Sequence, residues 1–155
     1  MRIVAQRVKE ARVDVAGETV GRIDTGILAL VGFGAGDGPE LPGSKAWRAL
    51  LSRLLTLRIF PDDQGRFNLG LGDVEGGLLL VSQFTLYADC RKGRRPSFTG
   101  AAAPELAAAL FERFVQDATA AYPGQVEQGV FAANMDVSLV NWGPVTITLD
   151  GADFA

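Results

Sequence analysis

The segment Ser82-Gln83-Phe84-Thr85 carries hydroxyl and amide groups directly after an apolar run, residues 78–81. The apolar run predicts a buried strand, and polar groups at the end of a rigid strand are well placed to hold a substrate. Backbone N–H groups there could also bind a negative charge on a ligand. We therefore expect Ser82, Gln83, Phe84 and Thr85 to form a catalytic site. The alternative is a polar strand end whose hydroxyls only cap the backbone.

The sequence has no histidine and a single cysteine, Cys90. This composition excludes Ser-His-Asp and Cys-His catalysis and metal sites built on histidine. One cysteine gives neither an internal disulfide nor a metal-ligand spacing, so we expect no metal and no cofactor. Thr85 therefore lacks an evident base. It is either a covalent nucleophile or a group that positions the substrate while another group attacks.

A second candidate segment, Asn141-Trp142-Gly143-Pro144, lies far downstream. Gly143-Pro144 is either a turn between two strands or, with a cis bond, a rigid presentation of backbone carbonyls to a ligand. Arg7 could fix those carbonyls by hydrogen bonding, or it could be a solvated strand arginine. Asn141 is expected to satisfy backbone groups nearby.

Four basic residues, Arg91, Lys92, Arg94 and Arg95, lie within five positions just after the first segment. Such a cluster predicts a phosphate-binding patch for RNA, although a solvated loop is the usual alternative. The net charge of the whole chain is −3, which argues against DNA or other nucleic acid binding through the general surface.

With 155 residues, of which 48% are hydrophobic, the chain is expected to form a single domain over residues 1–155. No apolar run approaches the roughly 20 residues that span a bilayer, so no membrane association is expected. The first residues lack the pattern of a signal peptide, and we expect a cytoplasmic protein.

The hydrophobic pattern predicts strands over residues 2–15, 20–24 and 27–31, arranged as a meander with a hairpin turn at 16–19. Ser44 is a predicted N-cap of a helix with a buried stripe of Trp47, Leu50, Leu51, Leu54 and Leu55. Short strands are predicted over 57–60 and 66–69, before the strand over 78–81.

Pro104 predicts the start of a second helix, which ends at 122–124 and buries Leu106, Leu110, Phe114 and Ala118. Strands over 125–128, 135–140 and 145–149 complete the chain. The expected fold class is α/β: one layered domain, mostly of antiparallel strands, with the two main helices packed on one face.

Taken with the two candidate segments, the whole chain resembles the D-aminoacyl-tRNA deacylase family, of the D-Tyr-tRNA deacylase type. Further matching segments occur in the family's order, at residues 4–8, 57–60, 67–69, 91–98 and 135–141. The chain departs from the family pattern at Trp142, where a small acidic residue is common, and at Val130, where arginine is common. Its loop over 32–43 is also longer.

The resemblance implies a metal-independent homodimer that frees tRNA from D-amino acids and from mischarged glycine. It implies a cis Gly143-Pro144 bond that reaches the other subunit's site, holds the α-amino group and excludes L side chains. Phe131 and Met135 are then candidates for the wall around the terminal adenosine, or ordinary core residues. Hydrolysis would be assisted by the tRNA 2′-hydroxyl. Two alternatives stay open: a Thr85-nucleophile esterase with no RNA requirement, and a non-catalytic RNA-binding module.

Overall fold

Two parallel strands, β3 (Gly26–Gly32) and β6 (Gly77–Ser82), form the centre of the sheet in the computed structural model, which describes residues 1–154. Their side chains alternate between two cores, so that Leu78 and Leu80 join one cluster and Leu79 and Val81 join the other. Because both faces are covered, the two strands are continuously apolar, as expected for residues 27–31 and 78–81.

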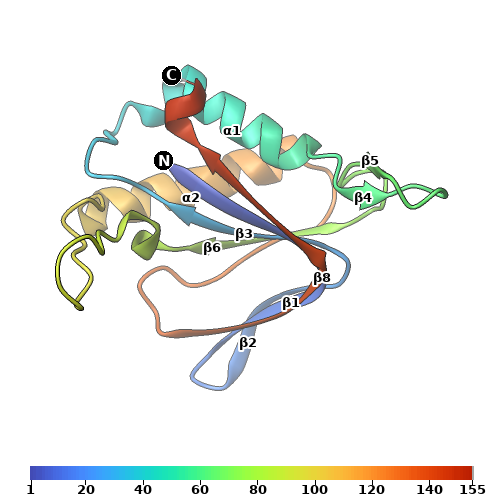
Figure 1. The fold of residues 1–155 in the computed structure, drawn as a ribbon, viewed down its shortest axis with the longest axis horizontal. Helices are drawn as coiled ribbons and strands as arrows, with labels where there is room; N and C mark the ends of the chain where they lie inside the picture. The colour runs from blue at the N-terminus through green and yellow to red at the C-terminus, as the bar shows by residue number, and fades with distance from the viewer. Residues whose placement is uncertain (155) are drawn as a thin grey trace.

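The longest strands, β1 (Arg2–Val15) and β8 (Met135–Asp150), run antiparallel along most of their length. The other edge of β1 pairs first with β3 and then with β2 (Glu18–Ile23), and β7 (Val126–Gln128) pairs with β6. The sheet order is β2-β1-β3-β6-β7, with β8 beside β1. The β1–β8 register shifts around Val8, and there the ribbon bends so that β2 lies across from β6 (Figure 1).

Three details of the predicted strands are wrong. The first three strands are not a meander, because β1 is long enough to lie between β2 and β3 and pair with both. Residues 135–140 and 145–149 belong to one strand, β8, so Gly143-Pro144 is not a turn between strands. The strand predicted over 57–60 is reduced to β4 (Phe60–Pro61), which pairs with β5 (Phe67–Leu69).

Both helices cover the same face of the sheet, as expected (Figure 1). Helix α1 (Lys45–Thr56) begins at the predicted cap, where Ser44 Oγ accepts a hydrogen bond from the Trp47 backbone N–H at 3.0 Å. Helix α2 (Pro104–Ala121) buries Ala107, Leu110, Phe111, Phe114 and Ala118, whereas the predicted Leu106 is only half-buried. The Trp47 and Phe114 rings pack edge to face, with centroids 5.2 Å apart.

Short 3-10 helices complete the fold at η1 (Leu41–Gly43), η2 (Phe84–Tyr87) and η3 (Gly151–Phe154). Of these, η2 begins one residue after β6 ends and therefore takes its position from a strand that is buried along most of its length. Within residues 1–154, neither helix is long and apolar enough to cross a membrane.

Candidate active site

The end of β6 positions the first candidate segment. The Gln83 backbone N–H donates to the Val31 carbonyl at 2.8 Å, so this N–H is unavailable to a substrate, contrary to our expectation. The N–H groups of Phe84 and Thr85 begin η2, and no side chain caps them. The first N–H groups of a helical turn have no partner within the turn, and these two make no hydrogen bond within residues 1–154. They are the available oxyanion donors.

Thr85 is held by its neighbour rather than by a base. Gln83 Nε2 donates to Thr85 Oγ1 at 2.6 Å, and this is the one side-chain hydrogen bond of Thr85 within the described chain. An activated nucleophile needs a base that accepts its proton. The amide of Gln83 acts here as a donor, so this arrangement suits a hydroxyl that positions a substrate.

A cavity of about 690 Å³ opens beside this segment, which is within the usual size of a small-molecule site. It brings Ser82, Gln83 and Phe84 together with Phe131 and Met135, as the adenosine hypothesis requires. Phe131 and Met135 also pack against the two cores, so both expected roles of these residues are compatible. Thr85 does not line the cavity and lies exposed at its edge.

Much of the cavity wall was missed by sequence reasoning. Phe98 packs edge to face against Phe84, with ring centroids 5.0 Å apart. The segment 101–104, together with Ala107, forms another part of the wall. The alanine-rich composition of 101–109 was the available signal, because small side chains at the start of a helix leave room for a ligand.

The second segment is held by a local hydrogen-bond network. The Gly143-Pro144 peptide is cis, and Gly143 has φ +142°. Asn141 Oδ1 accepts from the Val145 N–H at 2.7 Å, and Asn141 Nδ2 donates to the Val145 carbonyl at 3.3 Å. Asn141 therefore bonds both backbone groups of Val145, the residue that follows Pro144, as expected of a side chain that satisfies backbone groups nearby.

Arg7 lies behind this segment and is 5% exposed, so the interpretation as a solvated strand arginine is wrong. Its Nε donates to the Trp142 carbonyl at 2.7 Å, and its Nη1 donates to the Ile59 carbonyl. Burial lowers the pKa of the Arg7 guanidinium. Arg7 therefore fixes the residue that directly precedes Gly143.

Within one chain the two segments are separated. Val8 of β1 pairs with Asn141, which lies close to Gly143-Pro144 in β8. Val8 also pairs with Gly26 of β3, and Gly26 pairs with Gly77 at the start of β6. Ser82 is the last residue of β6. At about 3.3 Å per residue, five residues separate the two positions by about 17 Å along the strand. A site that uses both segments would need two chains.

The basic residues lie in a loop closed by backbone hydrogen bonds between Asp89 and Ser97. Arg91 is not a free cation: its Nε and Nη2 contact the two carboxylate oxygens of Asp89 at 2.9 and 2.7 Å. This pairing holds the pKa of Asp89 well below its usual range. Lys92, Arg94 and Arg95 are exposed and form no ion pair within residues 1–154. The patch therefore offers three free charges rather than four.

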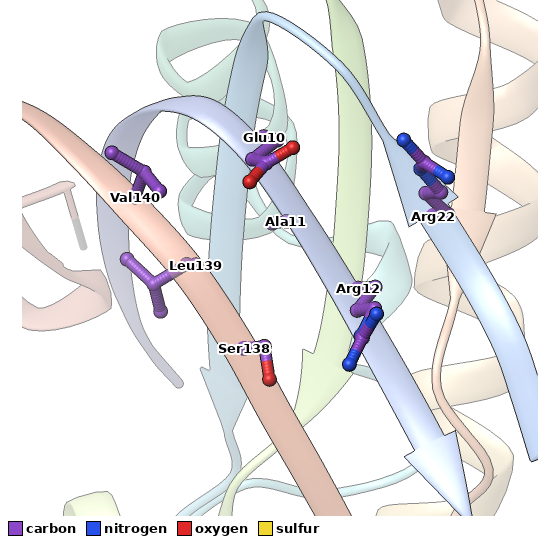
Figure 2. Close-up of a pocket in the computed structure, with 7 residues that line it drawn as sticks. All are labelled: Glu10, Ala11, Arg12, Arg22, Ser138, Leu139 and Val140. Carbon is purple, nitrogen blue, oxygen red and sulfur yellow. The ribbon is translucent and has the colours of Figure 1, made fainter.

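A different hollow, of about 300 Å³, lies on the outer face of β1, β2 and β8 (Figure 2). Arg12 and Arg22 line it from directly opposite positions, but each pairs with an aspartate, at 2.9 Å for Asp14 and 3.7 Å for Asp24. Glu10 adds a further carboxylate. The hollow is a surface of mixed charge and contains none of the predicted site residues. Within residues 1–154, no three Cys, Asp or Glu side chains gather as a metal site.

Comparison with known proteins identifies the family of the chain. The sequence model of the D-Tyr-tRNA(Tyr) deacylase family matches residues 4–150. The chain belongs to this family. As a member of this deacylase family, it is a hydrolase.

Individual relatives match over nearly their full length. A D-aminoacyl-tRNA deacylase of Solidesulfovibrio magneticus is 61% identical over 99% of this chain and 97% of the relative. One of Nitratidesulfovibrio vulgaris strain DP4 is 55% identical over 99% and 94%. A solved structure named c-Myc DNA Unwinding Element Binding Protein superposes with a TM-score of 0.86, at 34% identity, over 97% of this chain and 98% of the other.

Proposed function

We propose that the chain hydrolyses the ester that joins a D-amino acid to the terminal ribose of tRNA. One observation carries this proposal: a single cavity joins the Ser82-Gln83-Phe84 segment to Phe131 and Met135. Aromatic and soft apolar side chains are suitable partners for an adenine base. The polar segment on the other wall would then face the ester bond.

The proposed reaction needs only a few protein groups, which stabilise the oxyanion and position the ester. Water adds to the ester carbonyl carbon, and the carbonyl oxygen becomes an oxyanion. The bond to the ribose oxygen then breaks, and that oxygen takes up the proton that the water has lost. The Phe84 and Thr85 N–H groups are free to stabilise that oxyanion, and one such donor is worth about 2.7–4 kcal/mol. The neighbouring ribose 2′-hydroxyl would assist the attack, which is consistent with a chain that has no histidine. In this mechanism Thr85 positions the ester.

Selection of the D-amino acid would come from Gly143-Pro144 of a second subunit. Both residues are exposed and therefore available to another chain. The separation of about 17 Å within one chain favours a homodimer in which each subunit completes its partner's site. A rigid backbone close to the α-carbon would exclude an L side chain. Glycine has no side chain to exclude, so mischarged glycyl-tRNA would also be cleaved.

The acceptor end of tRNA would be bound by the loop that carries Lys92, Arg94 and Arg95. This loop runs between Phe84 and Phe98, which both line the cavity, so phosphates near the terminal adenosine would lie within its reach. A DNA-binding role, as the name of one structural relative suggests, has less support because the chain has a net charge of −3. A tRNA substrate places the protein in the cytoplasm.

A three-substrate assay tests the proposal. The purified protein is incubated with D-Tyr-tRNA, L-Tyr-tRNA and a D-tyrosine alkyl ester, and loss of each ester is followed. We expect cleavage of the first substrate only. Equal cleavage of the alkyl ester would favour a Thr85-nucleophile esterase that does not require RNA. Binding of tRNA without any cleavage would favour a non-catalytic RNA-binding module.

A further inference from the structure

The guanidinium of Arg7 contacts two aromatic rings. Its Cζ is 4.8 Å from the centroid of the Trp142 ring and 4.9 Å from that of Phe67. Arg7 belongs to β1, Trp142 to β8 and Phe67 to β5, so three separate elements meet at one side chain. These distances are within the range of favourable cation–π contacts.

The N–H groups at the edge of the Arg7 guanidinium form hydrogen bonds in addition to these ring contacts. Arg7 donates in its plane to the carbonyls of Ile59 and Trp142, which leaves the two faces of the group for aromatic contact. Trp142 is therefore held twice by Arg7, once through its carbonyl and once through its ring. The Trp142 ring also packs against the buried Phe60, with centroids 6.5 Å apart.

This arrangement adjoins the next residue in the chain, Gly143. A Cβ placed on Gly143 would lie 3.0 Å from Arg7 Nη2, so the guanidinium abuts the backbone of that glycine. Any movement of Arg7 would be transmitted to both Trp142 and Gly143. The position of the Gly143-Pro144 segment thus depends on how firmly Arg7 is held.

We propose that Phe67 and Trp142 form an aromatic clamp that positions the Gly143-Pro144 segment through Arg7. The two aromatic residues are positioning residues that set the discrimination between D- and L-substrates, and they touch no reacting atom. This inference rests on the function proposed above. It also accounts for Phe67, which is 58% exposed and for which the hydrophobic core offers no role.

The alternative is that Phe67 only contributes hydrophobic contact to the β4–β5 hairpin. Phe67→Leu keeps an apolar side chain but removes the aromatic face, and Phe67→Tyr restores that face. Val20→Ala changes another exposed apolar residue, on β2, and serves as the control. The rates kcat/KM are measured for D-Tyr-tRNA and L-Tyr-tRNA with each variant, alongside the Arg7 Nε–H proton shift by NMR.

For Phe67→Leu we expect cleavage of L-Tyr-tRNA to rise at least tenfold, while cleavage of D-Tyr-tRNA changes by no more than about threefold. The Arg7 Nε–H resonance should move downfield as the shielding ring is lost. Phe67→Tyr should restore both the wild-type rate of L-Tyr-tRNA cleavage and the wild-type Arg7 Nε–H shift, and Val20→Ala should change neither. The proposed clamp would be overturned if Phe67→Leu left the ratio of kcat/KM for D-Tyr-tRNA and L-Tyr-tRNA unchanged. It would also be overturned if kcat/KM fell equally for both substrates. Failure of the wild-type protein to cleave D-Tyr-tRNA would instead overturn the proposed function.

Discussion

The amide of Gln83 donates a hydrogen bond to the hydroxyl oxygen of Thr85, with Nε2 and Oγ1 2.6 Å apart. The bond occupies an acceptor position of that hydroxyl and supplies no acceptor for its proton. Nucleophilic hydroxyls are activated by the opposite relationship, in which a base receives the proton. This hydrogen bond therefore supports the proposed role of Thr85, which is to position the ester rather than to attack it.

Thr85→Ala should accordingly keep most of the chemistry. We expect kcat for D-Tyr-tRNA to fall by about tenfold or less, because the Phe84 and Thr85 backbone donors remain. Thr85→Ser, which keeps a hydroxyl for Gln83, should stay close to wild type. Single-turnover rates provide the measurement. A loss of roughly 10⁴-fold or more in Thr85→Ala would identify Thr85 as the nucleophile instead.

Arg7→Lys should be strongly destabilising despite the conserved charge. A lysine ammonium lacks the planar fork through which Arg7 reaches the Ile59 and Trp142 carbonyls from two separate nitrogens, and hydrogen bonds to charged groups contribute roughly 1.5–3 kcal/mol each. We expect a loss of about 2–4 kcal/mol in the free energy of unfolding, measured with urea. The matched variant Arg12→Lys, exposed on the same strand, should change it by less than about 0.5 kcal/mol. Equal effects of the two substitutions would contradict the role of Arg7.

Substrate binding should depend on salt through three basic residues. We expect the combined Lys92→Ala, Arg94→Ala and Arg95→Ala variant to raise KM for D-Tyr-tRNA. Its slope of log affinity against log salt should be less steep by roughly two units, at about 0.7–0.9 per phosphate contact. The control combines Asp89→Asn with Arg91→Gln, which removes a neutral pair and should leave the slope unchanged. A salt slope unaffected by the triple substitution would exclude this loop as the tRNA contact.

Tyr87 should make the protein sensitive to alkali. Burial, with a smaller effect of the Asp37 carboxylate, raises the pKa of Tyr87 to about 12. An unfolded tyrosine loses its proton near pH 10, so the native state binds more protons between about pH 10 and 12. Stability is therefore lost as the pH rises through this range. Urea unfolding at about pH 9 and pH 11 should show a smaller decrease for Tyr87→Phe than for wild type. An identical decrease would show that Tyr87 does not carry this effect.

The local pattern of the sequence was sufficient to predict both helices, the Ser44 cap and the doubly covered strands. These features depend on side-chain period and on capping chemistry within a few residues. The pairing of β3 with β1 rather than β2 was not predictable in the same way. It depends on the length and bending of β1, which bring together residues far apart in the sequence.

In the candidate site, too, some features follow from the local sequence and others depend on contacts between distant residues or on loop conformation. The polar segment at the end of β6 was expected from its position after an apolar run, but the engagement of the Gln83 N–H by Val31 depends on strand register. Likewise, Arg91 and Asp89 are only two residues apart, yet their pairing depends on a loop conformation that composition does not specify. The Arg7 contacts with Phe67 and Trp142 join three elements and have no sequence signal.

Subunit mixing tests most directly whether one site is built from two chains. Ala133→Trp places an indole in the cavity, and Gly143→Ala brings a Cβ within 2.8 Å of Val145 Cγ2 at a backbone φ of +142°. Each variant alone should be nearly inactive on D-Tyr-tRNA. In a heterodimer of the two variants, one site would contain the wild-type cavity and the wild-type Gly143-Pro144 segment together.

An equal mixture, unfolded and refolded together, should therefore recover about a quarter of the wild-type activity, because about half of the dimers are mixed and each of these has one intact site. Refolded wild type and each variant refolded alone are the controls. Recovery near that level is the predicted result. Heterodimers that form but stay inactive, or a protein that remains monomeric and active, would contradict the shared site.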